Sequence, residues 1–309
     1  MATHHLDDTQ PHAFWDNSYP ARLRIQPGDT VVFEILEGSN GQIRPDSTSE
    51  ALRTFNPAYL HALTGPVYVE GAEPGDALVV DIISLKHKGW GYNLVMPHLG
   101  LLGDDFAEPY LHHYKLGETT CEFRPDIQIP YEPFCGVMGV APREPGRLTT
   151  HPPRENAGNI DIRHLTAGSR AFFPVLVPGA LFSCGDCHSA QGDGEVSGTG
   201  IESPMTVTLT FTLQKGVHIP ELRFITPPGK KLTVADERGY FVTTAHGPDI
   251  FKNSQQAIRY MIDHLSTNYN MTREQAYCLC SVAVDLKISE LVDMLNWIVS
   301  AYLPLSIFK

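Results

Sequence analysis

Residues 185–195 carry side chains that bind metals and transfer protons, in the order Gly-Asp-Cys-His-Ser-Ala-Gln-Gly-Asp-Gly-Glu. Asp186 and His188 are two residues apart, so both side chains leave the same face of an extended strand. His, Asp and Glu are the ligands of catalytic zinc, which keeps one position open for water. The glycines let the backbone turn tightly or approach a ligand closely. The stretch therefore predicts metal-assisted hydrolysis.

Other interpretations of this stretch stay open. Gly-Asp-Gly beside acids is common in solvated turns, and Asp193-Gly194-Glu195 offers oxygen ligands for calcium without the spacing of an EF-hand. Cys184-Gly185-Asp186-Cys187-His188 matches the C-x-x-C-H pattern of c-type haem attachment, which would make the protein an electron carrier. We rank haem and a thioredoxin-like dithiol below hydrolysis. The chain shows no export signal, and no amphipathic helix follows the cysteines.

Length and charge limit the classes of function. The 309 residues can bury a large core, and 23 Lys and Arg against 35 Asp and Glu give a net charge of −12. An acidic protein gains nothing from phosphate backbones or anionic membrane surfaces, so we expect no nucleic-acid and no membrane partner. The first twenty residues lack the apolar run of a signal peptide. The six scattered cysteines fit a reducing cytoplasm, where we expect the protein.

Two similar turn-and-strand signals lie in the N-terminal half. Pro27-Gly28-Asp29 precedes the β-branched run Thr30–Ile35, and Pro74-Gly75-Asp76 precedes a second run at 77–83. We interpret the similarity of these two segments as two similar hairpins rather than an internal repeat. Further strands are predicted at 171–177, 205–213, 222–225 and 240–244.

A segment rich in Gly, Pro, His and Tyr occupies residues 89–133 and has little periodicity. We predict long loops that border the functional site. His112 and His113 lie within this segment. We assign them to a surface loop rather than to a metal-binding pair, since adjacent side chains point apart in extended backbone.

The sequence after Gly247-Pro248 becomes helical in pattern. Apolar residues recur at helical spacing over 254–266, and Thr272-Arg273-Glu274-Gln275 is a capping box before a helix at 276–284. A third helix is predicted at 289–300, with Met294 and Trp297 in the core. The fold class is α+β, with a β-rich body of sandwich or barrel-like sheets over 1–247 and a helical C-terminal portion over 248–309.

Five strings in this chain together resemble the acetamidase/formamidase family of metal-dependent amide hydrolases. They lie at residues 63–76, 136–139, 152–153, 158–162 and 186–195, with Gly198 and Glu202 beyond the last. The resemblance covers residues 12–308 and implies a single catalytic unit with a β-rich fold. Two departures are Ala157, where the family usually has Gly, and Glu37, where it often has Asp.

The resemblance implies hydrolysis of a short linear amide, of the formamide or acetamide type, to a carboxylate and ammonia. It implies a divalent metal, zinc first, with calcium as a candidate second ion. The family also includes γ-lactam hydrolases, so a cyclic amide is the alternative substrate. An alternative of another class is a metal-stabilised module that binds amides without hydrolysing them. The expected partners are a small amide and further copies of the chain, in a dimer or a higher homo-oligomer.

The chemistry of amide hydrolysis suggests a role for each candidate. We assign His188, Asp186 and Asp161 as metal ligands and Glu195 as the general base. Asn159 and Gln191 could donate to the oxyanion or orient the amide. The sequence contains no Gly-x-Ser-x-Gly elbow, which argues against an α/β-hydrolase. Four further residues are candidates for the first or second shell of the metal: Glu37, His61, Asp193 and Glu202.

Overall fold

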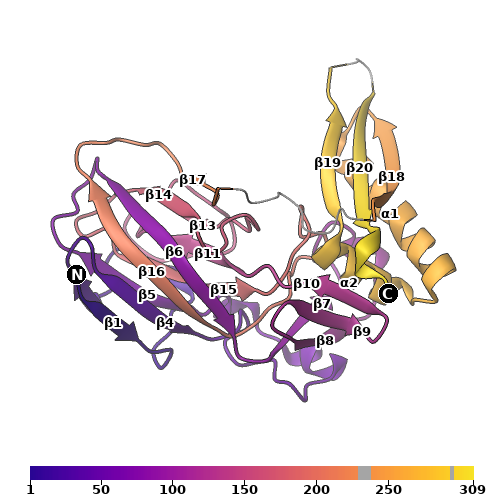
Figure 1. Ribbon diagram of the computed structural model, residues 1–309, viewed down its shortest axis with the longest axis horizontal. Coiled ribbons are helices and arrows are strands. Elements are labelled where there is room, and N and C mark those ends of the chain that lie inside the picture. The colour runs from indigo at the N-terminus through magenta and orange to yellow at the C-terminus, as the bar shows by residue number, and fades with distance from the viewer. Residues whose placement is uncertain (229–237, 293–295) are drawn as a thin grey trace.

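The computed structural model describes residues 1–228, 238–292 and 296–309. Its body is built on two sheets that share one apolar core (Figure 1). Phe33, Phe182 and Phe211 meet edge to face or at a tilt in that core, with ring centroids 5.2–6.4 Å apart. The first sheet has the order β1 (Thr3–Leu6), β4 (Thr30–Ile35), β16 (Met205–Gln214), β6 (Ala77–His87), β14 (Arg170–Pro174), β17 (Arg223–Ile225). The second has the order β13 (Ala157–Asn159), β11 (Phe134–Gly139), β15 (Phe182–His188), β5 (Leu63–Val69), β3 (Leu23–Ile25).

This sandwich confirms the strand-rich fold class and the strands predicted at 30–35, 77–83, 171–177, 205–213 and 222–225. The hairpin interpretation of the two Pro-Gly-Asp turns is wrong. β3 and β5 are parallel neighbours in one sheet, whereas β4 and β6 flank β16 in the other. Each turn therefore carries the chain between the sheets. Asp29 closes the first turn by accepting from the backbone N–H of Gln26.

A four-stranded sheet replaces the long loops that we predicted over residues 89–133. Its order is β10 (Ile127–Pro130), β9 (Thr120–Arg124), β8 (Tyr110–Leu116), β7 (Trp90–Val95). The prediction failed because half-buried His112 and His113 and buried Tyr92 and Tyr114 lie on these strands and blur the alternation of polar and apolar residues. His112 and His113 are not a metal pair. The first bonds the carbonyl of Phe123 at 2.9 Å and the second that of Ser47 at 2.7 Å.

The C-terminal part combines two helices with a three-stranded antiparallel sheet (Figure 1). α1 (Ile250–Tyr269) packs against β18 (Tyr240–Gly247), and α2 (Arg273–Ala283) begins with the predicted capping box at Thr272 and Gln275. The helix predicted over 289–300 is wrong, because β19 (Asp285–Glu290) and β20 (Trp297–Pro304) pair with each other. Trp297 is half-buried, and Met294 lies outside the described residues.

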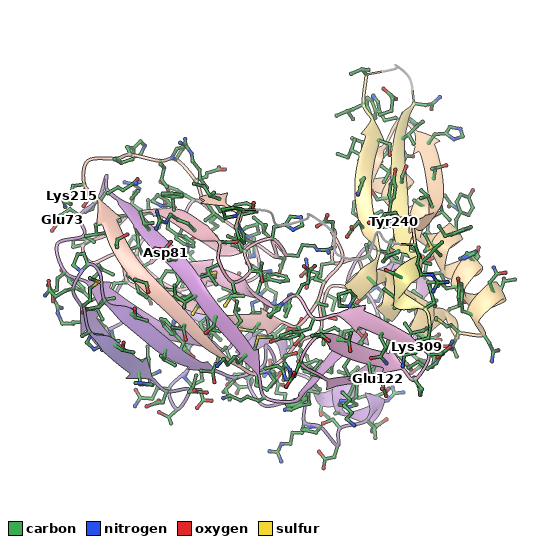
Figure 2. The ribbon with its side chains drawn as sticks, viewed as in Figure 1. Glu73, Asp81, Glu122, Lys215, Tyr240 and Lys309 are labelled. Carbon is green, nitrogen blue, oxygen red and sulfur yellow. The ribbon has the colours of Figure 1, made fainter. Side chains whose placement is uncertain are left out.

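The remaining elements are short. β2 (Phe14–Trp15) pairs with β12 (Leu148–Thr149), and the short 3₁₀ helices are η1 (Ser49–Thr54), η2 (Pro57–Tyr59), η3 (Gly103–Asp105) and η4 (Leu305–Ile307). Among the described residues, no helix is both long and apolar enough to cross a membrane. Figure 2 places Glu73 and Lys215 at the end of the body that is farthest from the C-terminal sheet.

β15 lies at the centre of the second sheet, between β11 and β5, and every residue of this strand is buried. Its last residue, His188, forms a bridge to Glu202, and Glu202 forms a second bridge to Tyr92 of β7. The end of β15 is therefore the point where the sandwich meets the four-stranded sheet. The predicted site residues gather there.

Candidate active site

Side chains from three separate segments meet at the end of β15. Asp186 and His188 lie on β15, Asp161 follows β13, and Glu195 and Glu202 lie on the connection from β15 to β16. Three of these residues adopt left-handed backbone, with φ of 52° at Asp186, 45° at Asp161 and 42° at Glu195. Such conformations are costly for residues with a Cβ and cluster at functional sites.

The imidazole of His188 lies at the centre of four carboxylates. Its Nε2 lies 3.0 Å from Oε1 of Glu202 and 3.6 Å from Oδ2 of Asp186. Its Nδ1 lies 3.9 Å from Oδ1 of Asp161 and 4.0 Å from Oε1 of Glu195. The structure thus brings together the three predicted ligands, the predicted base and one of the four shell candidates.

Gln191 fixes the orientation of His188. The amide Nε2 of Gln191 donates to the backbone carbonyl of Asp161 at 2.9 Å, so its Oε1 is the atom that lies 2.8 Å from Nδ1 of His188. That oxygen can only accept, so Nδ1 carries a proton and Nε2 is the nitrogen that faces the carboxylates. Burial lowers the pKa of His188, but the carboxylates of Glu202 and Asp186 outweigh burial and raise this pKa well above its usual value. Nε2 therefore ligates a cation by releasing a proton in exchange. The prediction that Gln191 contacts substrate is not supported, because both ends of its amide are used and it does not line the cavity.

His61 is held in the same way on the other side of Asp186. The hydroxyl of Thr150 donates to the carbonyl of Leu60 at 3.0 Å, so its oxygen accepts from Nδ1 of His61 at 3.1 Å. The Nε2 of His61 is left unprotonated and lies 3.8 Å from Oδ2 of Asp186. Burial lowers the pKa of His61, although the neighbouring Asp186 opposes this shift.

Two glycines make room for the carboxylates. A Cβ on Gly38 would lie 2.3 Å from Oδ1 of Asp186 and 2.9 Å from Oε2 of Glu202. A Cβ on Gly136 would lie 2.6 Å from Oδ1 of Asp161 and 3.0 Å from Oδ2 of Asp186. The carboxylate of Asp186 therefore lies between those of Glu202 and Asp161, and any residue larger than glycine would displace them.

Burial and crowding shift the protonation of these groups. Burial raises the pKa of Asp161 to about 7 and that of Glu202 to about 8, although His188 opposes both shifts. Burial and the neighbouring Asp161 raise the pKa of Glu195 well above its usual value. Asp186 is the exception, because His61 and His188 outweigh its burial and lower its pKa. Several acids with such different pKa values in one cleft are typical of catalytic sites.

The donor set fits a divalent cation. Three buried atoms have no hydrogen-bond partner among the described residues, namely Nε2 of His188, Oδ1 of Asp161 and Oε2 of Glu202. Two groups of three residues have ligand atoms that all lie within 4.8 Å of one another. The first group is Asp161, Asp186 and His188, and the second is His188, Glu195 and Glu202. Both groups draw on one imidazole whose Nδ1 is already used, so Nε2 can ligate only one ion. One imidazole and several carboxylates suit zinc.

The remaining candidates have different surroundings. Asn159 lines the cavity, but its Nδ2 donates to the carbonyl of His151 at 3.0 Å and its buried Oδ1 has no partner among the described residues. Asn159 therefore offers an acceptor at Oδ1 in addition to the second N–H of its amide, so the predicted oxyanion donor stays a prediction. Glu37 accepts from the hydroxyl of Tyr92 at 2.8 Å and from the backbone N–H of Ser39 at 2.7 Å, so it shapes the loop. Asp193 does not line the cavity.

Sequence reasoning missed three residues of the site, Thr150, Tyr92 and His151. Thr150 holds His61, Tyr92 packs beside Glu202 and bonds Glu37, and His151 lines the cavity with its ring centroid 5.3 Å from that of His61. The only available signal was His151 beside the Pro152-Pro153 string of the resemblance. Thr150 is 89 positions from His61, so no local pattern could pair them.

The cysteines of the C-x-x-C-H pattern face away from the site. Cys184 and Cys187 are fully buried in the core of the sandwich, and Cys187 Sγ lies 3.6 Å from Cys135 Sγ. The thiols have no access to a haem edge, and His188 is enclosed by carboxylates. This placement argues against the haem and dithiol interpretations.

The carboxylates form the floor of a cavity of about 390 Å³. His61, Asp161, Asp186, Glu195 and Glu202 line it on one side. Its other side is apolar and comes from residues 55–60, from the end of β7 and from Leu99.

Comparisons with known proteins agree with this architecture. A sequence model described as the Acetamidase/Formamidase family matches residues 2–147 and 144–309. An acetamidase of Mycolicibacterium smegmatis is 30% identical over 66% of each chain, and a formamidase of Methylophilus methylotrophus is 28% identical over 98% of this chain and 90% of its own.

Among solved structures, a gamma lactamase from Delftia acidovorans superposes with a TM-score of 0.91 at 27% identity, covering 100% of this chain and 94% of that chain. An acetamidase from Bacillus halodurans superposes with a TM-score of 0.69 at 28% identity, covering 97% and 96%. The position where this chain departs from the usual glycine of the family is Ala157, and its backbone, at φ 68°, is the left-handed conformation that favours glycine. The family match spans the whole chain, and so the chain belongs to the acetamidase/formamidase family.

Proposed function

We propose that this protein hydrolyses a linear amide to a carboxylate and ammonia at the cavity floored by His188 and its four carboxylates. As a member of its family the chain is an amidase, a hydrolase of carbon–nitrogen bonds other than peptide bonds. The observation that carries the location is the position of Nε2 of His188, which faces buried carboxylates beside a cavity of substrate size.

The ligands we propose for a divalent cation, zinc first, are Nε2 of His188 and the carboxylates of Asp186 and Asp161, with Glu202 beside them. When bound, such an ion lowers the pKa of a coordinated water to ~7 and polarises a carbonyl. Glu195 lines the same cavity, with its Oε1 4.0 Å from Nδ1 of His188, and we keep it as the proposed base. Calcium as a second ion stays a prediction. Asp193, which is one of its predicted ligands, does not line the cavity.

Glu195 is the proposed proton carrier. Its carboxylate can take a proton from the attacking water, and its raised pKa favours holding that proton until the departing nitrogen accepts it. Asn159 binds the amide, because its buried Oδ1 can accept an N–H from the substrate nitrogen. His61 offers a further ligand atom for the same cation, because its Nε2 lies 3.8 Å from Oδ2 of Asp186 and has no proton in the tautomer that Thr150 selects. Gln191 acts through His188 and never contacts the substrate.

A γ-lactam is the second candidate substrate. The observation that favours it is the TM-score of 0.91 to the gamma lactamase, against 0.69 to the acetamidase. A lactam places the same amide carbonyl on the cavity floor, but its amine stays tethered after ring opening. The two candidates therefore differ in whether ammonia is released.

The decisive assay combines elemental analysis of the purified protein with ammonia release from primary amides and ring opening of a γ-lactam. One divalent ion per chain and ammonia release would support the proposal. A metal-loaded protein that binds amides without turnover would instead be a binding module. The cytoplasmic location and the homo-oligomeric state stay predictions, which fractionation and sedimentation would test.

A further inference from the structure

We propose, on the basis of the proposed amide hydrolysis, that the preferred substrate is a primary amide whose acyl group carries an apolar chain of several carbons. Its carboxamide would lie on the polar floor of the cavity, and its chain would cover the apolar wall. The wall consists of Phe55, Pro57, Leu60, Leu94, Met96 and Leu99.

The size of the cavity is the first support. It measures about 390 Å³, whereas acetamide has only four non-hydrogen atoms. If each such atom takes at most the about 30 Å³ of a water molecule, acetamide fills roughly a third of the space. The rest would hold a cation and either water or more of the substrate.

The chemistry of the wall decides between water and substrate. Phe55 and Met96 pack onto an apolar cluster that includes Leu52 and Leu94, so this side of the cavity continues a hydrophobic core. Leu99 is 39% exposed at the same wall. Water in contact with such a surface gains few hydrogen bonds, and an apolar ligand displaces it favourably.

Polar groups near the wall already have partners. The hydroxyl of Tyr92 donates to Glu37 at 2.8 Å, so Tyr92 offers the cavity its ring. The hydroxyl oxygen of Thr199 accepts from the backbone N–H of Leu94 at 3.1 Å. The cavity therefore divides into a polar floor and an apolar wall, and a ligand that fits both must be amphipathic.

The reaction fixes which part of the substrate meets the wall. The nitrogen leaves as ammonia and carries no substituent, so only the acyl side of a primary amide can extend from the floor. The acyl group must also be uncharged at its end. A charge there would lose its hydration against the apolar side chains of the wall.

The first test is a series of primary amides from formamide through acetamide and butanamide to hexanamide. Burying one methylene yields ~0.8 kcal/mol, so kcat/KM should rise about fourfold with each added methylene until the cavity is full. A value that is flat or falls from formamide to hexanamide would overturn the proposal and leave amide hydrolysis itself intact.

A pair of variants locates the effect. Leu99→Ser removes an apolar wall residue that is already 39% exposed, and Leu291→Ser makes the same change at a leucine that is 48% exposed and does not line the cavity. We expect the ratio of kcat/KM for hexanamide to that for acetamide to fall at least threefold in the first variant and to stay at the wild-type value in the second. Equal ratios in all three proteins would contradict the assigned wall.

A binding measurement separates this inference from the proposed function. Methyl ketones keep the acyl chain but have no leaving nitrogen, so calorimetric titration of the metal-loaded protein reports binding alone. We expect 2-heptanone to bind at least tenfold more tightly than acetone. Tightening with chain length but no amide turnover would refute the proposed function and support the apolar wall. Turnover of amides without tighter binding of the longer ketone would support the proposed function and refute the apolar wall.

Discussion

Nδ1 of His188 lies 2.8 Å from Oε1 of Gln191, and this one hydrogen bond determines which ring nitrogen faces the carboxylates. Gln191 is itself oriented by the backbone carbonyl of Asp161, at 2.9 Å. A side chain expected to touch substrate therefore acts as the support of the proposed metal ligand.

The role of Gln191 can be tested by truncation. Gln191→Ala frees His188 to rotate and to change tautomer, and loss of such a support typically lowers metal affinity 10–100-fold. Competition with a chelator of known affinity measures the effect. Gln255→Ala is the matched control, because Gln255 also donates its amide to a backbone carbonyl, that of Leu101, but does not bond His188. Equal metal affinity in both variants would mean that His188 needs no orientation from Gln191.

Glu195→Gln keeps the size of the side chain but cannot carry the proton. General acid–base groups contribute ~10²–10⁴-fold, so kcat should fall by about that factor while the metal content stays unchanged. If the metal is lost with the activity, Glu195 is a ligand in the group it forms with His188 and Glu202. Unchanged kcat would remove Glu195 from the mechanism.

The cysteines next to the site should be dispensable. Cys184 and Cys187 lie in the core with their thiols away from the cavity, and burial raises the pKa of both, which keeps them protonated. The double Ser variant should retain most of its turnover, with a loss of thermal stability from polar groups placed in the core. A folded double variant that is fully inactive would point to thiol chemistry instead.

His112 should make the fold sensitive to acid above the range of ordinary carboxylates. Burial lowers its pKa from 6.5 to about 4. The unfolded chain therefore binds more protons between these values, and stability falls as the pH drops through that window. At about 1.4 kcal/mol per unit, the contribution lost is about 3 kcal/mol.

The check compares denaturant midpoints of the native protein and His112→Gln from pH 7 to pH 4. The variant should lose less stability over this range, although it is less stable at pH 7 because His112 stacks on Phe123 with ring centroids 4.2 Å apart. Parallel pH profiles would show that His112 does not contribute to acid unfolding.

The sequence predicted correctly those elements whose signals lie within a few neighbouring residues. Thr30–Ile35 and Met205–Gln214 follow β-branched alternation, and Thr272 with Gln275 forms its capping box within four residues. The stretch 289–300 was predicted as a helix, but its described ends belong to the strands at 285–290 and 297–304. The pairing of these strands with each other, and of the second with β18, overrides local preference. Tertiary pairing of this kind leaves little trace in a short window of sequence.

The residues of the site show the same difference between neighbouring and long-range signals. Asp186, His188 and Glu195 come from one short stretch, so composition and spacing were enough to propose them. The support of His61 by Thr150 and the bridge of Glu202 to Tyr92 join residues that are 89 and 110 positions apart, and only the fold brings them together. The left-handed backbone at Asp186 also has no sequence signal, since neither neighbour is proline and the residue is not glycine.

The most direct test is the metal content of His188→Ala, measured by elemental analysis beside ammonia release from acetamide. His113→Ala serves as the control, because His113 bonds the carbonyl of Ser47 and does not line the cavity. The site described above predicts that His188→Ala folds but loses both bound metal and turnover, while His113→Ala keeps both. Full metal occupancy and undiminished ammonia release in His188→Ala would contradict it.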